Sequence, residues 1–111
     1  MQQDEWIVVL ILSQSFLAMT NIVFGIWQSA FLLMGYGMLL LVKTLAIIAF
    51  GYDEPFRTIQ ASAISSFVET PTIFTATVLL YTRDPVICMA IFDSTFSLLG
   101  TIYGSMTLYK S

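Results

Sequence analysis

The stretch Ala61–Ala76, ASAISSFVETPTIFTA, decides how the rest of the chain is arranged. It is apolar enough to lie inside a membrane, yet it carries Glu69 and Pro71 near its centre. An ionised carboxylate at that depth costs on the order of a few kcal/mol on insertion scales. We therefore expect another buried polar or charged group to compensate Glu69.

The composition is that of an integral membrane protein. Of the 111 residues, 58% are hydrophobic and 10% are charged, and the mean hydropathy is +0.87; soluble domains contain about 25% charged residues. The net charge of −3 argues against nucleic acid as a partner, because phosphate binding needs a basic patch. Histidine is absent, which excludes histidine-ligated metal sites. We expect no metal and no cofactor apart from structural lipids, and we interpret Cys88 as a small buried apolar residue.

Two hydrophobic helices are predicted before the first clear loop. Residues 6–50 contain one charged residue, Lys43. As one helix they would be about 67 Å long, over twice the ~30 Å hydrocarbon core, so the chain must turn back. The turn is predicted at Gly25–Ser29, which joins a glycine, polar groups and a tryptophan, with Gly35–Gly37 as the alternative. The predicted helices are residues 6–25 and 30–50.

Two further helices follow, each after an acidic residue and a proline. Glu54 precedes Pro55, and Asp84 precedes Pro85, an arrangement typical of helix starts. The third and fourth helices are predicted at residues 56–81 and 86–108. The sequence thus predicts an all-α integral membrane protein, a single transmembrane domain over residues 1–111 with four transmembrane helices in two antiparallel hairpins with short loops.

The few basic residues predict the orientation. With four spans, both termini and the 51–57 loop share one side of the membrane, which carries Arg57 and Lys110, whereas Arg83 lies on the other side. Positively charged loops tend to face the cytoplasm. Both termini are therefore expected on the cytoplasmic side, or the matrix side in a mitochondrion.

Small and polar residues repeat at helical spacing in the first and fourth predicted helices. Such stripes allow helices to approach closely and to form hydrogen bonds in lipid. We interpret them as helix-packing faces, the alternative being the walls of a substrate path. The stripes are Gln14, Ala18, Asn21 and Gly25 in the first helix, and Ser97, Gly100 and Gly104, following Asp93, in the fourth.

Three charged residues on three different helices are predicted to lie at similar depth. Counting along the helices places Glu69 roughly 18 Å from the 51–57 side, Asp93 roughly 12 Å from the opposite side, and Lys43 roughly 12 Å in. We predict a buried charge cluster in which Lys43 pairs with Glu69, Asp93 or both. One carboxylate then remains, and it must hold a proton, bind a cation or pair with another protein. Pro71 predicts a helix kink, which suits either a transport site or a static bend.

These features favour a small, non-catalytic integral membrane subunit of a larger complex of the respiratory, ATP-synthase or photosynthetic type. The loops are too short for a soluble active site, and no nucleophile–base pair, metal cluster or phosphate loop is present. We expect the chain to act in assembly, stability and lipid contact, with other membrane subunits and lipids as partners. The mitochondrial inner membrane, or another energy-transducing membrane, is the favoured location.

Two alternatives remain open. The first is a homo-oligomeric proton- or cation-coupled transporter or channel that uses Glu69 and Asp93. The chain resembles the small multidrug resistance transporters in size, but it has Ser13–Ser15 in the helix where they carry their hallmark glutamate. The second is a membrane enzyme or lipid-handling accessory, since residues 24–27 and 96–100 resemble short fragments of a sterol-biosynthesis scaffold family.

Overall fold

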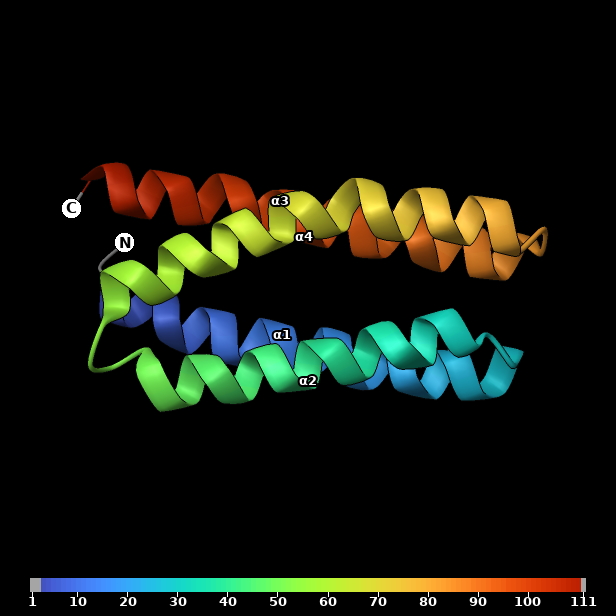
Figure 1. Ribbon diagram of the computed structural model, residues 1–111, viewed down its shortest axis with the longest axis horizontal. Coiled ribbons are helices and arrows are strands. Elements are labelled where there is room, and N and C mark those ends of the chain that lie inside the picture. Colours follow the sequence, from blue (N-terminus) through green and yellow to red (C-terminus); the bar gives the residue numbers. More distant parts are fainter. Residues whose placement is uncertain (1–2, 111) are drawn as a thin grey trace.

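The computed structural model describes residues 3–110 and shows a chain of four long helices (Figure 1). They are α1 (Gln3–Gln28), α2 (Phe31–Phe50), α3 (Pro55–Leu80) and α4 (Asp84–Lys110). Each of the four is long and apolar enough to cross a membrane. The prediction of an all-helical chain with four helices of this kind is confirmed. Helices α1 and α4 extend two or three residues beyond the predicted bounds at each end.

The four helices are arranged as two closely packed pairs. Figure 1 shows α1 beside α2 and α3 beside α4, and contacts within each pair are denser than contacts between the pairs. We call the contact between the α1/α2 pair and the α3/α4 pair the seam. The bundle is 43 Å long, and α1 begins and α4 ends at the same end as the α2–α3 loop.

The connection between α1 and α2 lies at Ser29 and Ala30. Ser29 adopts the left-handed conformation, with φ of 55°, directly after the last residue of α1. The N–H of Ala30 donates to Gly25 O at 2.8 Å and the N–H of Ser29 donates to Ile26 O at 3.3 Å. These two bonds are those of a Schellman motif, which satisfies the free carbonyls at the end of a helix. The turn is therefore not at Gly35–Gly37, which lies inside α2.

The other two connections are also short. Glu54 is the N-cap of α3 and Pro55 occupies its first turn, at the position that the sequence indicated. Tyr81 ends α3, and its hydroxyl accepts a hydrogen bond from the backbone N–H of Leu32 at 3.1 Å. That N–H lies in the first turn of α2, where helices leave backbone donors without partners. Tyr81 thus links the end of α3 to the start of α2.

The interior is built from apolar clusters that succeed one another along the bundle. At the end that carries the α2–α3 loop, the cluster consists of Trp6, Ile7, Leu10, Ile47 and Ile59; Leu17, Ala18, Tyr36 and Leu40 form the next, and Ala30, Leu33, Val86 and Met89 the last. The interpretation of Cys88 as a buried residue is wrong, because its side chain is exposed. It lies on the outer face of α4, where a small apolar thiol suits a lipid environment as well as a core.

Helices α1 and α2 approach each other closely at Gly37. A Cβ atom built on Gly37 would lie 2.6 Å from Ile22 Cγ1 and 2.8 Å from the backbone oxygen of Ala18. Glycine at this position of α2 therefore lets α1 and α2 come together at a distance that no other residue allows. By contrast, a Cβ built on Gly35 meets nothing within 4 Å.

We predict opposite effects for alanine at these two glycines. Gly37→Ala should force α1 and α2 apart and lower the free energy of unfolding by about 1–3 kcal/mol. Gly35→Ala is the matched control, because it adds the same atom to the same helix in open space; it should raise that free energy by about 0.5–1 kcal/mol. Denaturant titration in detergent micelles measures both. Equal effects of the two substitutions would contradict the close approach at Gly37.

Candidate functional site

The charged side chains in the middle of α2 and α3 form an ion pair across the seam. Lys43 Nζ lies 3.7 Å from Glu69 Oε1, and the two side chains are 12% and 11% exposed. Lys43 Nζ also donates a hydrogen bond to Ser66 Oγ at 3.1 Å, and Ser65 Oγ donates one to Glu69 Oε1 at 3.2 Å. Each charge therefore has an opposite charge and a hydroxyl group beside it. A buried ion pair needs such additional hydrogen bonds to offset its desolvation.

Tyr36 connects this ion pair to α4. Its hydroxyl donates to Glu69 Oε2 at 3.4 Å and lies 3.2 Å from Ser97 Oγ. A phenol has one proton, so donation to Glu69 makes Ser97 the donor of the second bond. Sequence analysis did not single out Tyr36. The spacing of Tyr36 could have indicated its place in the site: it precedes Lys43 by seven residues, so the two side chains lie on the same face of α2.

Asp93 is held separately, by Asn21 of α1. Asn21 Nδ2 donates to Asp93 Oδ1 at 2.8 Å and to the carbonyl of Leu17 at 2.8 Å. Both residues are fully enclosed, with Asp93 1% exposed and Asn21 0%. The second oxygen of each side chain, Asp93 Oδ2 and Asn21 Oδ1, has no hydrogen-bond partner within the described part of the chain.

Of the three charged residues that the sequence grouped together, the structure brings Lys43 and Glu69 into contact and places Asp93 apart from Lys43. Among the side chains that the structure describes, the recorded ion pairs are Lys43–Glu69 and Arg57–Glu54, so Asp93 has no basic partner there. It lies one helical turn from Ser97, which contacts Tyr36. Polar side chains from all four helices thus follow one another through the seam: Asn21, Tyr36, Lys43, Ser65, Ser66, Glu69, Asp93 and Ser97.

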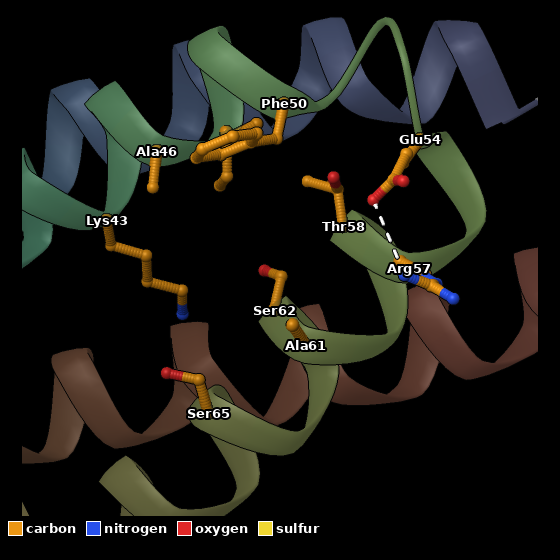
Figure 2. A pocket seen from close by; sticks show the side chains of 10 residues that line it. Lys43, Ala46, Phe50, Glu54, Arg57, Thr58, Ala61, Ser62 and Ser65 are labelled. Atoms are coloured by element: carbon orange, nitrogen blue, oxygen red, sulfur yellow. Dashed lines mark ion pairs between the residues drawn. The ribbon is translucent and has the colours of Figure 1, made fainter.

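A pocket of about 330 Å³ between α2 and α3 leads from the α2–α3 loop to Lys43. Figure 2 shows the Lys43 side chain extending from α2 toward the serines of α3, with the Arg57–Glu54 pair at the loop end. That outer pair is solvent-exposed, with a distance of 3.9 Å between Arg57 Nη1 and Glu54 Oε2. The pocket wall combines hydroxyl groups and apolar side chains, among them Phe50, Thr58, Ser62 and Ser65.

The predicted packing stripes lie at contacts between helices. Gln14, Ala18, Asn21 and Gly25 of α1 are buried, as are Ser97 and Gly104 of α4, and Gly100 is partly buried. A Cβ built on Gly100 would lie 3.8 Å from Ser66 Oγ, and one on Gly104 would lie 3.4 Å from Ala63 Cβ. These are ordinary contact distances, so α3 and α4 approach less closely than α1 and α2 do at Gly37.

Pro71 lies on an exposed face of α3, and the helix continues through it. Figure 1 shows the first half of α3 inclined relative to its second half. Two threonines beside the proline bond to backbone carbonyls one turn earlier, Thr70 to Ser66 O and Thr72 to Val68 O, both at 2.9 Å. These acceptors flank the carbonyl of Phe67, the one that Pro71 leaves without its helical N–H donor.

Comparisons with models of known protein families, with curated protein sequences and with solved structures find no match to this chain. In the described residues, no group of three or more histidine, cysteine, aspartate or glutamate side chains is placed to hold a metal ion.

We predict that the Asn21–Asp93 contact is a coupled pair. Asn21→Val removes the amide donor to Asp93 and should lower the free energy of unfolding by about 1–3 kcal/mol, because a buried acceptor loses its partner. Thr20→Val is the matched control on the same helix, because the Thr20 hydroxyl donates its hydrogen bond to the carbonyl of Phe16, one turn earlier in α1. The double variant Asn21→Val/Asp93→Val should lose less than the sum of the two single variants. Strictly additive losses, measured in detergent micelles, would contradict the pairing.

Proposed function

We propose that the chain crosses a membrane as two antiparallel hairpins, α1–α2 and α3–α4, and acts as a non-catalytic subunit of a larger membrane assembly. Its contribution is to the stability of that assembly and to its contact with lipid. The proposal rests on the surfaces of the chain that can contact lipids or other proteins.

The dimensions and the surface support membrane insertion. The bundle length of 43 Å matches the ~40–45 Å of a bilayer with its head groups. Large apolar side chains point outward on every helix, for example Leu12 on α1, Val42 on α2, Leu79 on α3 and Ile102 on α4, which are 46–77% exposed. In water such a surface would drive aggregation, whereas in lipid it is the expected exterior.

The observation that carries the subunit role is that large apolar side chains are exposed along the flanks of all four helices. The connections between helices comprise Ser29–Ala30, residues 51–54 and residues 81–83, and none forms a domain outside the bundle. The charged side chains in the middle of the helices, Lys43, Glu69 and Asp93, are turned into the seam. Contacts with other molecules therefore have to be made sideways, through the flanks, which suits lipids and the helices of neighbouring subunits.

The outer face of α1 offers one specific place for a neighbour. A hollow of about 460 Å³ is lined entirely by α1 side chains, including Phe16, Met19, Val23 and Trp27. Helices associate in lipid through close van der Waals packing, so a hollow between large side chains can receive the side chains of another helix. The charge distribution of the sequence favours an orientation in which the end with Arg57 faces the cytoplasm or the matrix.

A second candidate function, coupled transport, is supported by the interior. The pocket between α2 and α3 reaches the Lys43–Glu69 pair from one end of the bundle. Beyond that pair, Tyr36 and Ser97 continue the line of polar groups toward Asp93, one oxygen of which has no hydrogen-bond partner among the described residues. Buried acids of membrane helices are frequent components of proton and cation pathways.

Native mass separates the two functions. We expect the protein, gently extracted from its own membrane, to migrate in a heteromeric particle far larger than the 12.4 kDa chain and to copurify with other proteins in fixed ratio. Trp27→Ala, in the hollow on α1, should release the chain from that particle. Tyr109→Ala is the control, because Tyr109 is exposed at the end of α4, away from the hollow.

A particle containing a few copies of this chain and nothing else would contradict the subunit role and favour transport. In that case Glu69→Gln should abolish proton- or cation-coupled flux into proteoliposomes, because it removes the carboxylate paired with Lys43, which lines the pocket between α2 and α3. If both Trp27→Ala and Tyr109→Ala remain in the large particle, the contact with the neighbouring subunit is not made through the α1 hollow.

A further inference from the structure

A second pocket, of about 300 Å³, lies between α1 and α4 on the seam. Its walls are apolar, formed by Val9 and Leu10 of α1 and by Phe96 and Leu99 of α4. Among the residues that the structure describes, no charged side chain lines it. Gly100 and four side chains with polar groups, Trp6, Ser13, Gln14 and Tyr103, complete the lining. The Ser13 hydroxyl donates to the carbonyl of Leu10 at 3.3 Å, and Trp6 and Gln14 are more than nine-tenths buried.

Trp6 presents a hydrogen-bond donor that nothing in the described chain accepts. Its side chain is 7% exposed, and Nε1 has no partner. The ring packs at 6.1 Å from the ring of Tyr103, which also lines the pocket. Nε1 faces Gly104 of α4, where a built Cβ would lie 3.5 Å from it, an ordinary contact distance. Buried indole N–H groups normally find an acceptor.

Gln14 presents the complementary group. It is 4% exposed, and its Oε1 has no donor among the described residues. An enclosed amide oxygen without a partner loses its interaction with water and gains nothing in return. Trp6 and Gln14 are eight residues apart on α1, which places them about 12 Å apart along the helix axis and on the same face. One pocket therefore contains an unused donor and an unused acceptor, separated along its length.

The lining defines the chemistry of what would satisfy both groups. The absence of charge in the pocket wall excludes a charged head group, because nothing there would compensate it. A hydroxyl group can accept a hydrogen bond from Trp6 and can donate one to Gln14. The volume has room for roughly ten non-hydrogen atoms, taking the ~30 Å³ of a water molecule for each. That is enough for a segment of one hydrocarbon chain.

We propose that the α1–α4 pocket binds a neutral, single-chain lipid with an oxygen function near Trp6 and a hydroxyl group near Gln14. The apolar walls contact the hydrocarbon between these two polar groups. The inference requires the chain to lie in a membrane, as proposed above, but it does not require a larger assembly. This ligand site is separate from the Lys43–Glu69 ion pair and from the pocket between α2 and α3.

The test uses the purified full-length chain and three photoreactive probes that differ only in their polar groups. They are a long-chain diol with a hydroxyl at each end, the mono-alcohol of the same length and the corresponding alkane, each with a diazirine in mid-chain. We expect the diol to label peptides from residues 9–14 and 96–103 most strongly, and the alkane least. Equal labelling by all three probes, or labelling confined to other segments, would overturn the proposal.

The chain supplies a matched control for each polar group. Trp6→Phe and Gln14→Leu remove the donor and the acceptor while keeping side chains of similar size. Each should reduce labelling by the diol about threefold to tenfold, the effect of one hydrogen bond. Trp27→Phe and Gln28→Leu make the same changes outside the pocket and should leave labelling unchanged. If only one of Trp6→Phe and Gln14→Leu reduces labelling by the diol, the result still supports the site and identifies the end of the pocket at which the hydroxyl binds.

A second measurement guards against variants that are merely misfolded. The diol should raise the midpoint of thermal unfolding of the unmodified chain and of both control variants, and it should have a smaller effect on Trp6→Phe and Gln14→Leu. An equal rise in all five proteins would overturn the proposal. Because the protein is tested alone, failure here leaves the native-mass experiment, and with it the proposed subunit role, unaffected.

Discussion

The ion pair between Lys43 and Glu69 is the interaction on which the rest of the structure depends. It lies between two helix pairs that present apolar side chains outward, and in lipid such surfaces gain nothing from the hydrophobic effect when helices come together. Within the α1/α2 pair, close packing at Gly37 supplies the attraction. Between the pairs, contacts are sparser, and the recorded side-chain hydrogen bonds from α1 or α2 to the other pair all involve polar groups of the seam or Tyr81. Leaving either charge without the other would place an uncompensated ion inside the bundle.

Two pockets of different chemistry open on the seam. Its centre is occupied by polar groups that mostly satisfy one another, and pockets open on two sides of it, one between α2 and α3 and one between α1 and α4. The first reaches an ion pair, whereas the second contains uncharged donors and acceptors without partners. The outer flanks remain apolar and available to lipids and neighbouring helices. The interior of the chain thus fixes how the two helix pairs sit together.

How much of this could be predicted depends on what a sequence encodes locally. Composition and the lengths of the apolar runs indicated four helices, and the acidic residue and proline at Glu54–Pro55 indicated the start of α3. Counting residues gives the depth of a side chain in the bundle, which is why Lys43 and Glu69 could be grouped. Depth does not give the rotation of each helix about its axis. The partner of Asp93, the close approach at Gly37 and the outward position of Cys88 depend on that rotation, which is decided by packing between helices.

A double-mutant cycle on the ion pair tests the central claim most directly. The free energy of unfolding is measured in detergent micelles for the unmodified chain, Lys43→Met, Glu69→Leu and the double variant. If the pair holds the seam, each single variant loses about 3–5 kcal/mol, because one charge is left buried without its partner. The double variant then loses clearly less than the sum of the two. Losses that simply add, or that are too small to measure, would mean that Lys43 and Glu69 do not depend on each other and that something else joins the two helix pairs.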